Sequence, residues 1–398
     1  AMEHQDQNDI RLHNTQMLLE IIRTRRLVSR ADLAKLARMS PTSVTRIVGD
    51  LQRLNLVRET NQFSTGVGRR AVMLDIVPHE LYTLGIQIDK HYFRICIMDF
   101  ASTPVVLETI KYDCCRHSVE ETVQFCLSHY QRLARARNID TGKVIGMGVA
   151  VVGAVDPENK RSLLSPQLGW HNIPLHDYFY EAFGLPLVVD NDVKASLLGE
   201  QHILSISPSS EIALLLLGSG VGSAVSAGGS IFRGRQNAAG EVGHIIVDHG
   251  ANAAVCECGR SGCLQTHVAV QYLIAKAQAH DPKLTTLHQL RQAYDAGTDW
   301  AVAIMDDCMQ HIVLALDIIT SMYNPAQTVI YGSLLYEFSH LLPDMLSRYK
   351  KTIQVPGVSA NNIVVSTPDD TSCVLGCCLM TYRELLPSYL EDRILCAT

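Results

Sequence analysis

Three cysteines fall within the eight residues of the segment CECGRSGC, at positions 256–263, and a histidine precedes them at His244. The spacing is His-x11-Cys-x-Cys-x4-Cys, and three cysteines with one histidine are a common closed ligand set for zinc. A disulfide between Cys256 and Cys258 would strain its ring, and a redox Cys-x-x-Cys is absent from the segment. We therefore predict one structural Zn²⁺ per chain, held by His244, Cys256, Cys258 and Cys263.

A second group of chemically active side chains ends the segment LPLVVDND, where Asp190, Asn191 and Asp192 follow an apolar strand pattern. Ligands usually bind at such strand ends in α/β sheets. A carboxylate beside an amide can hold sugar hydroxyls, and the same carboxylate can take a proton from a hydroxyl that attacks a phosphate. The alternative is an Asx-rich turn that caps the next helix.

Two glycine-rich segments follow further along the chain. LGSGVGS places Gly218, Gly220 and Gly222 after a strand, which suits either a phosphate-binding loop or a tight hairpin. AAGEVGHIIVD carries Glu241 and the predicted zinc ligand His244 between glycines.

The first eighty residues must position a different kind of site. Ser29 with Asp32 fits a capping box for a helix that ends near Met39, and Ser40 followed by Pro41 opens a second helix that ends near Leu54. Two short helices joined by a tight turn predict a helix-turn-helix, and a plain solvated helical hairpin is the alternative. The segment LVRETNQFSTGVGRRAVMLDI then predicts a β-hairpin, which makes the unit a winged helix.

This winged helix predicts binding to operator DNA. The start of the second helix presents small hydroxyls and a guanidinium that suit phosphate and base-edge contacts in a major groove. The wing tip combines glycine with two cations, which suits a minor groove. The predicted DNA-binding residues are Pro41, Thr42, Ser43, Thr45, Arg46, Gly68, Arg69 and Arg70. Because a palindromic site needs two copies, we expect a homodimer or homotetramer.

Composition bounds the remaining possibilities. The chain has 398 residues and a net charge of −6, but residues 1–80 hold 12 Lys+Arg against 9 Asp+Glu. This asymmetry permits nucleic-acid binding at the front of the chain only. No apolar run approaches the roughly 20 residues of a membrane span, and no secretion signal is recognisable, so we expect no membrane insertion. Scattered single cysteines favour a reducing cytoplasm.

The segments GEVGH, CECGRSGCLQT and DND, together with the winged helix, make the chain resemble the ROK family of repressors, open reading frames and sugar kinases. Its layout is similar to the bacterial repressors of N-acetylglucosamine and glucose-uptake genes. The resemblance implies a winged helix at 10–78 and a two-lobed, actin-like (ribonuclease H-like) α/β sugar-kinase-type domain. The first lobe is expected at 79–192 with a returning helix at about 375–395, and the second lobe, with the zinc site, at 193–374.

The resemblance also implies where a sugar binds in the cleft between the lobes. The implied contacts are Gly153, Asn191, Asp192, Glu241, His244 and Gln265. Trp170 lies in a loop that matches one near the sugar, although simple packing would also explain it. Gln265 stands where family kinases have glutamate, so we expect altered sugar selectivity.

One departure from the family bears on catalysis. Family kinases carry Asp-x-Gly-Gly-Thr on the first hairpin, whereas this chain has IDKHYFR, with Lys90, His91 and Tyr92 after Asp89. Bulky side chains there block the close approach of ATP phosphates. We therefore predict a sugar-responsive transcriptional regulator, most simply a repressor of carbohydrate uptake or catabolism genes, with a sugar or sugar phosphate as effector and no enzymatic activity. The alternative is an ATP-dependent sugar kinase with Asp192 as general base. A zinc hydrolase is rejected because four protein ligands leave no position for water.

Overall fold

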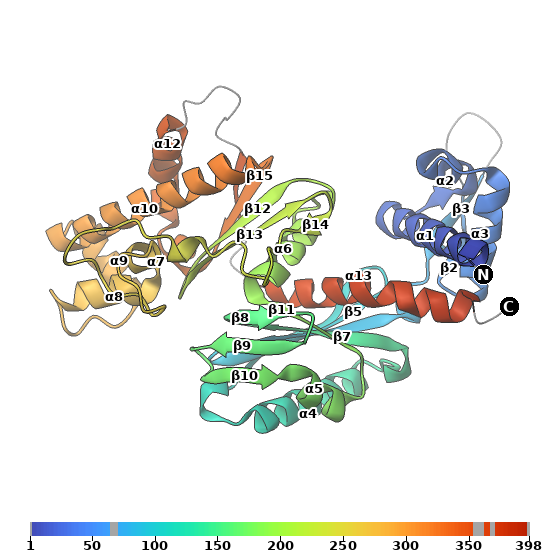
Figure 1. Ribbon diagram of the computed structural model, residues 1–398, viewed down its shortest axis with the longest axis horizontal. Helices are drawn as coiled ribbons and strands as arrows, with labels where there is room; N and C mark the ends of the chain where they lie inside the picture. The colour runs from blue at the N-terminus through green and yellow to red at the C-terminus, as the bar shows by residue number, and fades with distance from the viewer. Residues whose placement is uncertain (1, 64–70, 353–361, 367–370, 396–398) are drawn as a thin grey trace. The chain divides into compact units, whose positions relative to one another are not determined.

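The structure, a computed structural model, describes residues 2–63, 71–352, 362–366 and 371–395 (Figure 1). The chain divides into two compact units. Unit 1 comprises residues 1–192 and 374–398, and unit 2 comprises residues 193–373. None of the helices in the described ranges has the length and apolar character needed to cross a membrane.

The N-terminal part of unit 1 has three helices and a small sheet. The helices are α1 (Met2–Arg25), α2 (Arg30–Ala37) and α3 (Pro41–Arg53), and the strands are β1 (Val28–Ser29), β2 (Val57–Phe63) and β3 (Val72–Ile76). The strand order is β1-β3-β2, with both pairings antiparallel. Apolar side chains at helical spacing on α3 form the core with α1, including Leu18, Ile22, Val44, Ile47 and Leu51. The elements follow the order of a winged helix-turn-helix, and the tip residues Gly68, Arg69 and Arg70 lie outside the described residues.

The rest of unit 1 is built on a five-stranded sheet of order β11-β7-β4-β5-β6. Its strands are β4 (Tyr82–Ile88), β5 (Tyr92–Asp99), β6 (Pro104–Lys111), β7 (Val144–Val151) and β11 (Leu187–Asn191). Helices α4 (Val119–Ala136) and α5 (Leu175–Phe183) pack on one face with Leu84, Ile86 and Phe93. A smaller antiparallel sheet joins β8 (Ala154–Asp156), β9 (Arg161–Ser165) and β10 (Trp170–Pro174).

Helix α13 (Ser372–Leu395) packs on the other face of the five-stranded sheet (Figure 1). Glycines make this contact close: a Cβ on Gly85 would lie 2.6 Å from the carbonyl oxygen of Val374, and one on Gly148 would lie 2.1 Å from that of Cys377. Any larger residue at these two positions would therefore push the helix off the sheet.

Unit 2 contains a sheet of order β14-β13-β12-β15-β16, flanked by helices. The strands are β12 (Ile212–Leu217), β13 (Val221–Ala227), β14 (Ser230–Ile231), β15 (Gln327–Tyr331) and β16 (Asn362–Val365). The helices are α6 (Asp192–Ile203), α7 (Gln265–Val268), α8 (Val270–Gln278), α9 (Leu287–Asp295), α10 (Asp299–Tyr323), α11 (Ser333–Glu337) and α12 (Leu342–Thr352). Helix α6 packs on one face through Val193 and Leu197, and α10 belongs to the larger core on the other face.

The main sheets of the two units have the same strand order. In each, the first three strands form an antiparallel meander, and the fourth and fifth strands add in parallel beside the first. The two copies share topology rather than residue identity, so the amino-acid sequence does not reveal the repeat.

Candidate functional site

The candidate DNA-reading surface is the start of α3. Ser40 caps the helix, since its hydroxyl accepts from the backbone N–H of Ser43 at 3.2 Å, and Pro41 occupies the first turn. Thr42 and Arg46 are exposed, while the hydroxyl of Thr45 donates to the carbonyl oxygen of Pro41 at 2.9 Å. Thr42 and Arg46 therefore offer the free polar groups of this surface, and Thr45 presents chiefly its methyl group.

A buried ion pair fixes α3 against α1. Arg11 Nη2 donates to Asp50 Oδ2 at 2.8 Å, and Arg53 contacts the other carboxylate oxygen. The Asp50 side chain is only 7% exposed. Burial raises the pKa of Asp50, but the hydrogen bonds and charges of Arg11 and Arg53 outweigh burial and hold it below its usual value. The carboxylate is therefore ionised and its pairing orients the recognition helix.

A second pair holds the wing strand β3. Arg26 donates from Nε and Nη2 to the two oxygens of Asp75, at 2.5 and 2.8 Å. Such a bidentate contact fixes the relative orientation of the two side chains in addition to pairing their charges. Burial raises the pKa of Asp75, and Arg26 more than reverses that effect, so the pKa lies below its usual value.

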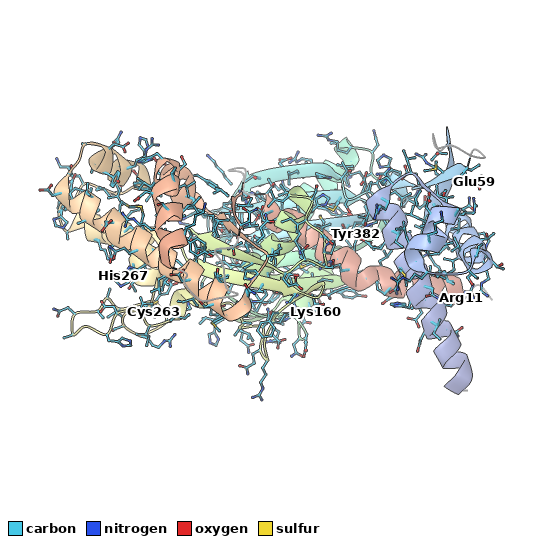
Figure 2. The ribbon with its side chains drawn as sticks, turned by 90° about the horizontal axis from the view of Figure 1, so that it is seen from above. Arg11, Glu59, Lys160, Cys263, His267 and Tyr382 are labelled. Carbon is cyan, nitrogen blue, oxygen red and sulfur yellow. The ribbon has the colours of Figure 1, made fainter. Side chains whose placement is uncertain are left out.

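The same α1 helix also contacts α13 (Figure 2). The guanidinium of Arg23 lies 4.9 Å from the ring centre of Tyr382 and 5.8 Å from that of Phe100. The buried Tyr382 hydroxyl donates toward the carbonyl oxygens of Leu81 and Met98, which lie on either side of the β4–β5 pair. The N-terminal helices are thus tied to the sheet through a cation–π contact on a fixed ring.

The predicted sugar residues of unit 1 lie together at the end of β11. Asn191 Nδ2 donates to the carbonyl oxygen of Gly153 at 3.1 Å and to Asp192 Oδ1 at 2.8 Å. The backbone N–H of Asn191 donates to Asp190, and Asp192 opens α6. The strand end thus carries a cluster of oxygen acceptors, while Trp170 is 4% exposed and packs in the core.

In unit 2, the short 3-10 helix Val242–His244 places Glu241 beside His244. The His244 Nε2 atom is 4.0 Å from a carboxylate oxygen of Glu241, and the Nδ1 atom is 3.6 Å from the sulfur of Cys256. One side of the ring therefore faces a cysteine and the other faces an exposed carboxylate. A metal bound at Nδ1 would leave Nε2 available to a ligand.

The four predicted metal ligands come together. One ligand atom each from His244, Cys256, Cys258 and Cys263 lies within 4.8 Å of every other. The sulfurs of Cys258 and Cys263 are 3.6 Å apart. Tetrahedral zinc–sulfur bonds of about 2.3 Å place sulfurs roughly 3.8 Å apart, so the spacing fits a Cys3His zinc site.

The surroundings of Cys258 and Cys263 shift their pKa values in opposite directions. Burial raises the pKa of Cys258, but hydrogen bonds from the backbone and guanidinium of Arg260 and from the neighbouring thiols lower it to about 6. Burial and the neighbouring thiols raise the pKa of Cys263 to about 12. A bare cluster thus shares its protons unevenly, and a cation would release the remaining ones.

Gln265 links Glu257 of the cysteine segment to the strand that follows the glycine-rich turn. Gln265 is buried; its Nε2 donates to Glu257 Oε1 at 2.6 Å, and its Oε1 accepts from the backbone N–H of Val221 at 3.2 Å. Val221 begins β13 after the turn at Gly218 and Gly220, which joins β12 to β13 as a tight hairpin. The amide of Gln265 therefore supports this hairpin.

Two residues of this region were missed by sequence reasoning. Arg260 donates to the carbonyl oxygen of His244 at 2.6 Å, and Glu257 carries the bond to Gln265. Both lie inside the cysteine segment, where the only available signal was a charged residue between ligands. Their roles depend on tertiary partners that spacing does not reveal.

The first hairpin of the sheet lacks the glycines of a phosphate loop. The backbone N–H of Asp89 donates to the carbonyl oxygen of Tyr92, and Lys90 donates from its backbone to the Asp89 carboxylate. His91 Nδ1 is 2.9 Å from Asp113. Side chains and their hydrogen bonds thus occupy the turn.

Comparison with known proteins identifies the family. The model described as "ROK family" matches residues 83–384. The chain belongs to the ROK family. Curated ROK relatives include a putative xylose repressor of Caldicellulosiruptor sp., 24% identical over 95% of this chain and 98% of the relative. Another is the N-acetylglucosamine repressor of Escherichia coli O6:H1, 24% identical over 92% of each chain.

Solved ROK structures share the fold. A ROK family transcriptional regulator, homologous to the E. coli MLC protein, superposes with a TM-score of 0.76 at 23% identity and covers 98% of each chain. A ROK hexokinase from Thermus thermophilus has a TM-score of 0.66 at 19% identity and covers 77% of this chain and 99% of its own. The hexokinase thus matches over a smaller share of the chain than the regulator does.

Proposed function

We propose that this ROK protein is a sugar-responsive DNA-binding regulator, most simply a repressor of carbohydrate uptake or catabolism genes. The observation that carries the proposal is a helix-turn-helix part, with exposed Thr42 and Arg46, that belongs to the same compact unit as the first sheet of the ROK-matching region. The names of the curated relatives, which are repressors related to xylose and N-acetylglucosamine, support it.

In this proposal α3 enters the major groove of an operator. Arg46 and Thr42 contact phosphates and base edges, and the capped start of α3 directs its positive dipole toward the phosphates. The wing residues Gly68, Arg69 and Arg70 are proposed minor-groove contacts. A palindromic operator would engage two copies of the chain, as a homodimer or homotetramer.

The proposed sugar contacts are Gly153, Asn191 and Asp192 of unit 1 and Glu241, His244 and Gln265 of unit 2. The carboxylates of Asp192 and Glu241 accept from sugar hydroxyls, and the amide of Asn191 can donate to one. Gln265 is expected to act mainly by supporting the β12–β13 hairpin, because both ends of its amide are already bonded.

Zinc, held by His244, Cys256, Cys258 and Cys263, would supply a closed tetrahedral centre without an open position for water. The chain's own contribution is orientation. The Nδ1 atom of His244 faces Cys256, and the Nε2 atom faces Glu241. With Nδ1 held at the metal centre, the proton of the ring is on Nε2, where it can donate to a sugar hydroxyl. Cys256→Ala is expected to lose zinc, stability and sugar response together. Retention of the sugar response after loss of zinc would contradict this role.

We propose that the chain does not phosphorylate the sugar. His91 and Tyr92, which follow Lys90, stand where the family's kinases carry glycines, and the ring of His91 is engaged by Asp113. An ATP-turnover assay across hexoses and N-acetyl sugars decides between the two functions. Turnover that disappears in Asp192→Asn would establish the kinase with Asp192 as general base.

The response to sugar requires that the sugar bind better to one DNA-binding state than to the other. The operator is first obtained by selecting DNA from a random pool with the full chain. A thermal-shift screen of sugars and sugar phosphates then finds the effector, because a ligand at 100 times its Kd stabilises by about 2.7 kcal/mol.

Asp192→Ala tests the assignment of the site. We expect this variant to bind operator DNA like the wild type and to lose the change in operator affinity caused by the sugar. Asp177→Ala, at an exposed position on α5, is the matched control and should keep the response. A normal sugar response in Asp192→Ala would refute the site, and absence of operator binding by the wild type would refute the regulator.

A further inference from the structure

Four ionisable side chains from three helices of unit 2 gather outside the predicted zinc and sugar residues. His267 of α7 lies with Nδ1 2.9 Å from Asp307 Oδ2 of α10, and Lys276 of α8 lies 3.4 Å from the same oxygen (Figure 2 labels His267). His311, one turn after Asp307, has its Nδ1 3.3 Å from the other carboxylate oxygen. One aspartate therefore faces two histidines and a lysine.

The residue types invite a metal, but the geometry argues against one. The rings of His267 and His311 are stacked, with centroids 3.8 Å apart and planes within 17°. Lone pairs in nearly parallel, stacked rings cannot both point at one ion. The Nδ1 atom of His311 is also 2.8 Å from the carbonyl oxygen of Asp307, and the Lys276 ammonium already supplies a cation to the carboxylate. Hydrogen-bonded protons fit this arrangement better.

The two rings differ in what surrounds them. The Nε2 atom of His267 is buried, and no hydrogen-bond partner for it exists in the part of the chain that the structure describes. The Nδ1 atom, which faces Asp307, is therefore the ring nitrogen through which His267 makes its hydrogen bond. His311 has two oxygens near its Nδ1, and its side chain is 17% exposed, so water reaches it more readily.

We propose that His311 is a proton-binding site that fastens α7 to α10. In the protonated state, the imidazolium of His311 contacts the Asp307 carboxylate and stacks on the face of the His267 ring, which attracts a cation. Proton binding thereby strengthens the tie between the short helix α7 and the long helix α10, and proton loss weakens it.

The groups around His311 decide whether its pKa is raised or lowered. Asp307 favours the protonated ring, and burial and Lys276 oppose it; the hydrogen bond and charge of Asp307 prevail, so the pKa of His311 lies above its usual value. Asp306, beside the cluster, is neutralised by Arg348 of α12 at 2.8 Å. Buried Cys308 has a pKa raised to about 12 by burial and by Asp307, so it stays a neutral thiol.

The sign of the pH effect follows. A histidine whose pKa is raised in the folded state contributes stability that is fully present below its unfolded pKa of about 6.5 and is lost as the pH rises through the folded pKa. The tie between α7 and α10 is therefore stronger in mildly acidic conditions and weaker above neutrality.

The tie has a consequence for the proposed sugar site, and this step rests on the proposed function. Helix α7 begins at Gln265, whose amide holds both Glu257 of the cysteine segment and Val221 of β13. His267 lies two positions after Gln265 on the same four-residue helix. A weaker contact between His267 and α10 therefore also makes the position of Gln265 less well fixed. Sugar affinity is then expected to fall as the pH rises through the His311 pKa.

Titration of the histidine ring signals by NMR, on full chains with labelled histidine, tests the proton site without any sugar. Loss of one signal in His311→Gln assigns that ring. We expect its midpoint above about 6.5 in the wild type and lower by about one unit or more in Asp307→Asn, because an opposite charge at this range shifts a pKa by about 1–3 units. His171→Gln, an exposed histidine of unit 1, is the matched control and should leave the midpoint unchanged. A wild-type midpoint at or below 6.5, or one unaffected by Asp307→Asn, would overturn the proposal.

Two further measurements separate the alternatives. Zinc titration should give one equivalent per chain; a second equivalent that is lost in His267→Gln would overturn the proton site in favour of a metal. Sugar affinity measured between about pH 6 and about pH 9 should fall in the wild type and change less in His311→Gln. An unchanged wild-type affinity would overturn the link to the sugar site, whereas failure of every sugar to bind at any pH would refute the proposed function and leave the titration result standing.

Discussion

Replacing Asp50 by alanine tests how α3 is held on α1. The change removes a carboxylate that is 7% exposed and leaves the Arg11 guanidinium, on a side chain that is 22% exposed, without its partner. Since Arg11 and Asp50 are 39 residues apart, their pairing orients two helices rather than supporting one. We expect the free energy of local opening of α3 to fall and operator binding to weaken.

The magnitude follows from the burial of each partner. A hydrogen bond between largely buried charged groups contributes about 1.5–3 kcal/mol, which applies to Arg11. Arg53 is 68% exposed, so its share is at most about 1 kcal/mol. Alanine returns about 0.5 kcal/mol through its better helix propensity. The net loss should be about 1–3.5 kcal/mol, and a double-mutant cycle with Arg11→Ala should recover most of it as coupling.

Hydrogen exchange of the α3 amides, read by mass spectrometry on the full chain, measures the free energy of local opening. Arg53→Ala is the control and should cost about 1 kcal/mol or less. A loss below about 1 kcal/mol in Asp50→Ala, or an Arg53→Ala variant that costs as much, would refute the reasoning. The first result would mean that apolar packing orients α3, and the second that the exposed Arg53 contributes as much as the buried pair.

Three further predictions concern other parts of the chain. Gly262→Ala should lower zinc content and the thermal midpoint, because φ is +78° and the new Cβ would lie 1.8 Å from the carbonyl oxygen of Asp248. Gly297→Ala is the control, since its φ of +73° is similar but its Cβ would meet no atom within 4 Å, so it should cost only backbone strain. Equal effects of the two variants would contradict the clash. Arg23→Ala should speed exchange in α1 by removing a cation–π contact of about 0.5–2 kcal/mol on Tyr382, and unchanged exchange would contradict that contact. Because the pKa of Asp75 is lowered in the folded state, this group stabilises the fold above its unfolded-state pKa of about 3.9, and that stability is lost as the pH falls through the folded-state pKa. Acid unfolding followed by circular dichroism should therefore begin at higher pH in Asp75→Asn. An unfolding curve like the wild type's would contradict this role of Asp75.

Local signals carried much of the N-terminal prediction. The sequence SPT predicts a helix that starts at Pro41, and α3 begins there with Ser40 as its cap, because capping depends only on neighbouring residues. The apolar segment VIGMGVAVVGAVD, residues 144–156, predicts one continuous strand, but β7 ends at Val151 and β8 begins at Ala154, with Gly153 between them at a φ of +106°. Alternation continues through such a break, so periodicity does not reveal it.

The candidate sites divide in the same way. Ligand spacing predicted the grouping of His244 with the three cysteines, since the cysteines lie in one short loop. Pairings that depend on tertiary packing left no such trace. His267 meets Asp307 across 40 residues, and Gln265 meets Val221 across 44. Only the fold brings these partners together, and no periodicity or motif marks them.

The order of synthesis gives α13 a further significance. The sheet that supports the N-terminal helices receives its second covering layer from residues 374–395, which the ribosome makes after the strands of that sheet. Until then Gly85 and Gly148 are uncovered, and Arg23 has no Tyr382 to stack on. In a nascent chain the helix-turn-helix is therefore made well before the helix that holds it in place. Premature termination before α13 would release a winged helix without its anchor.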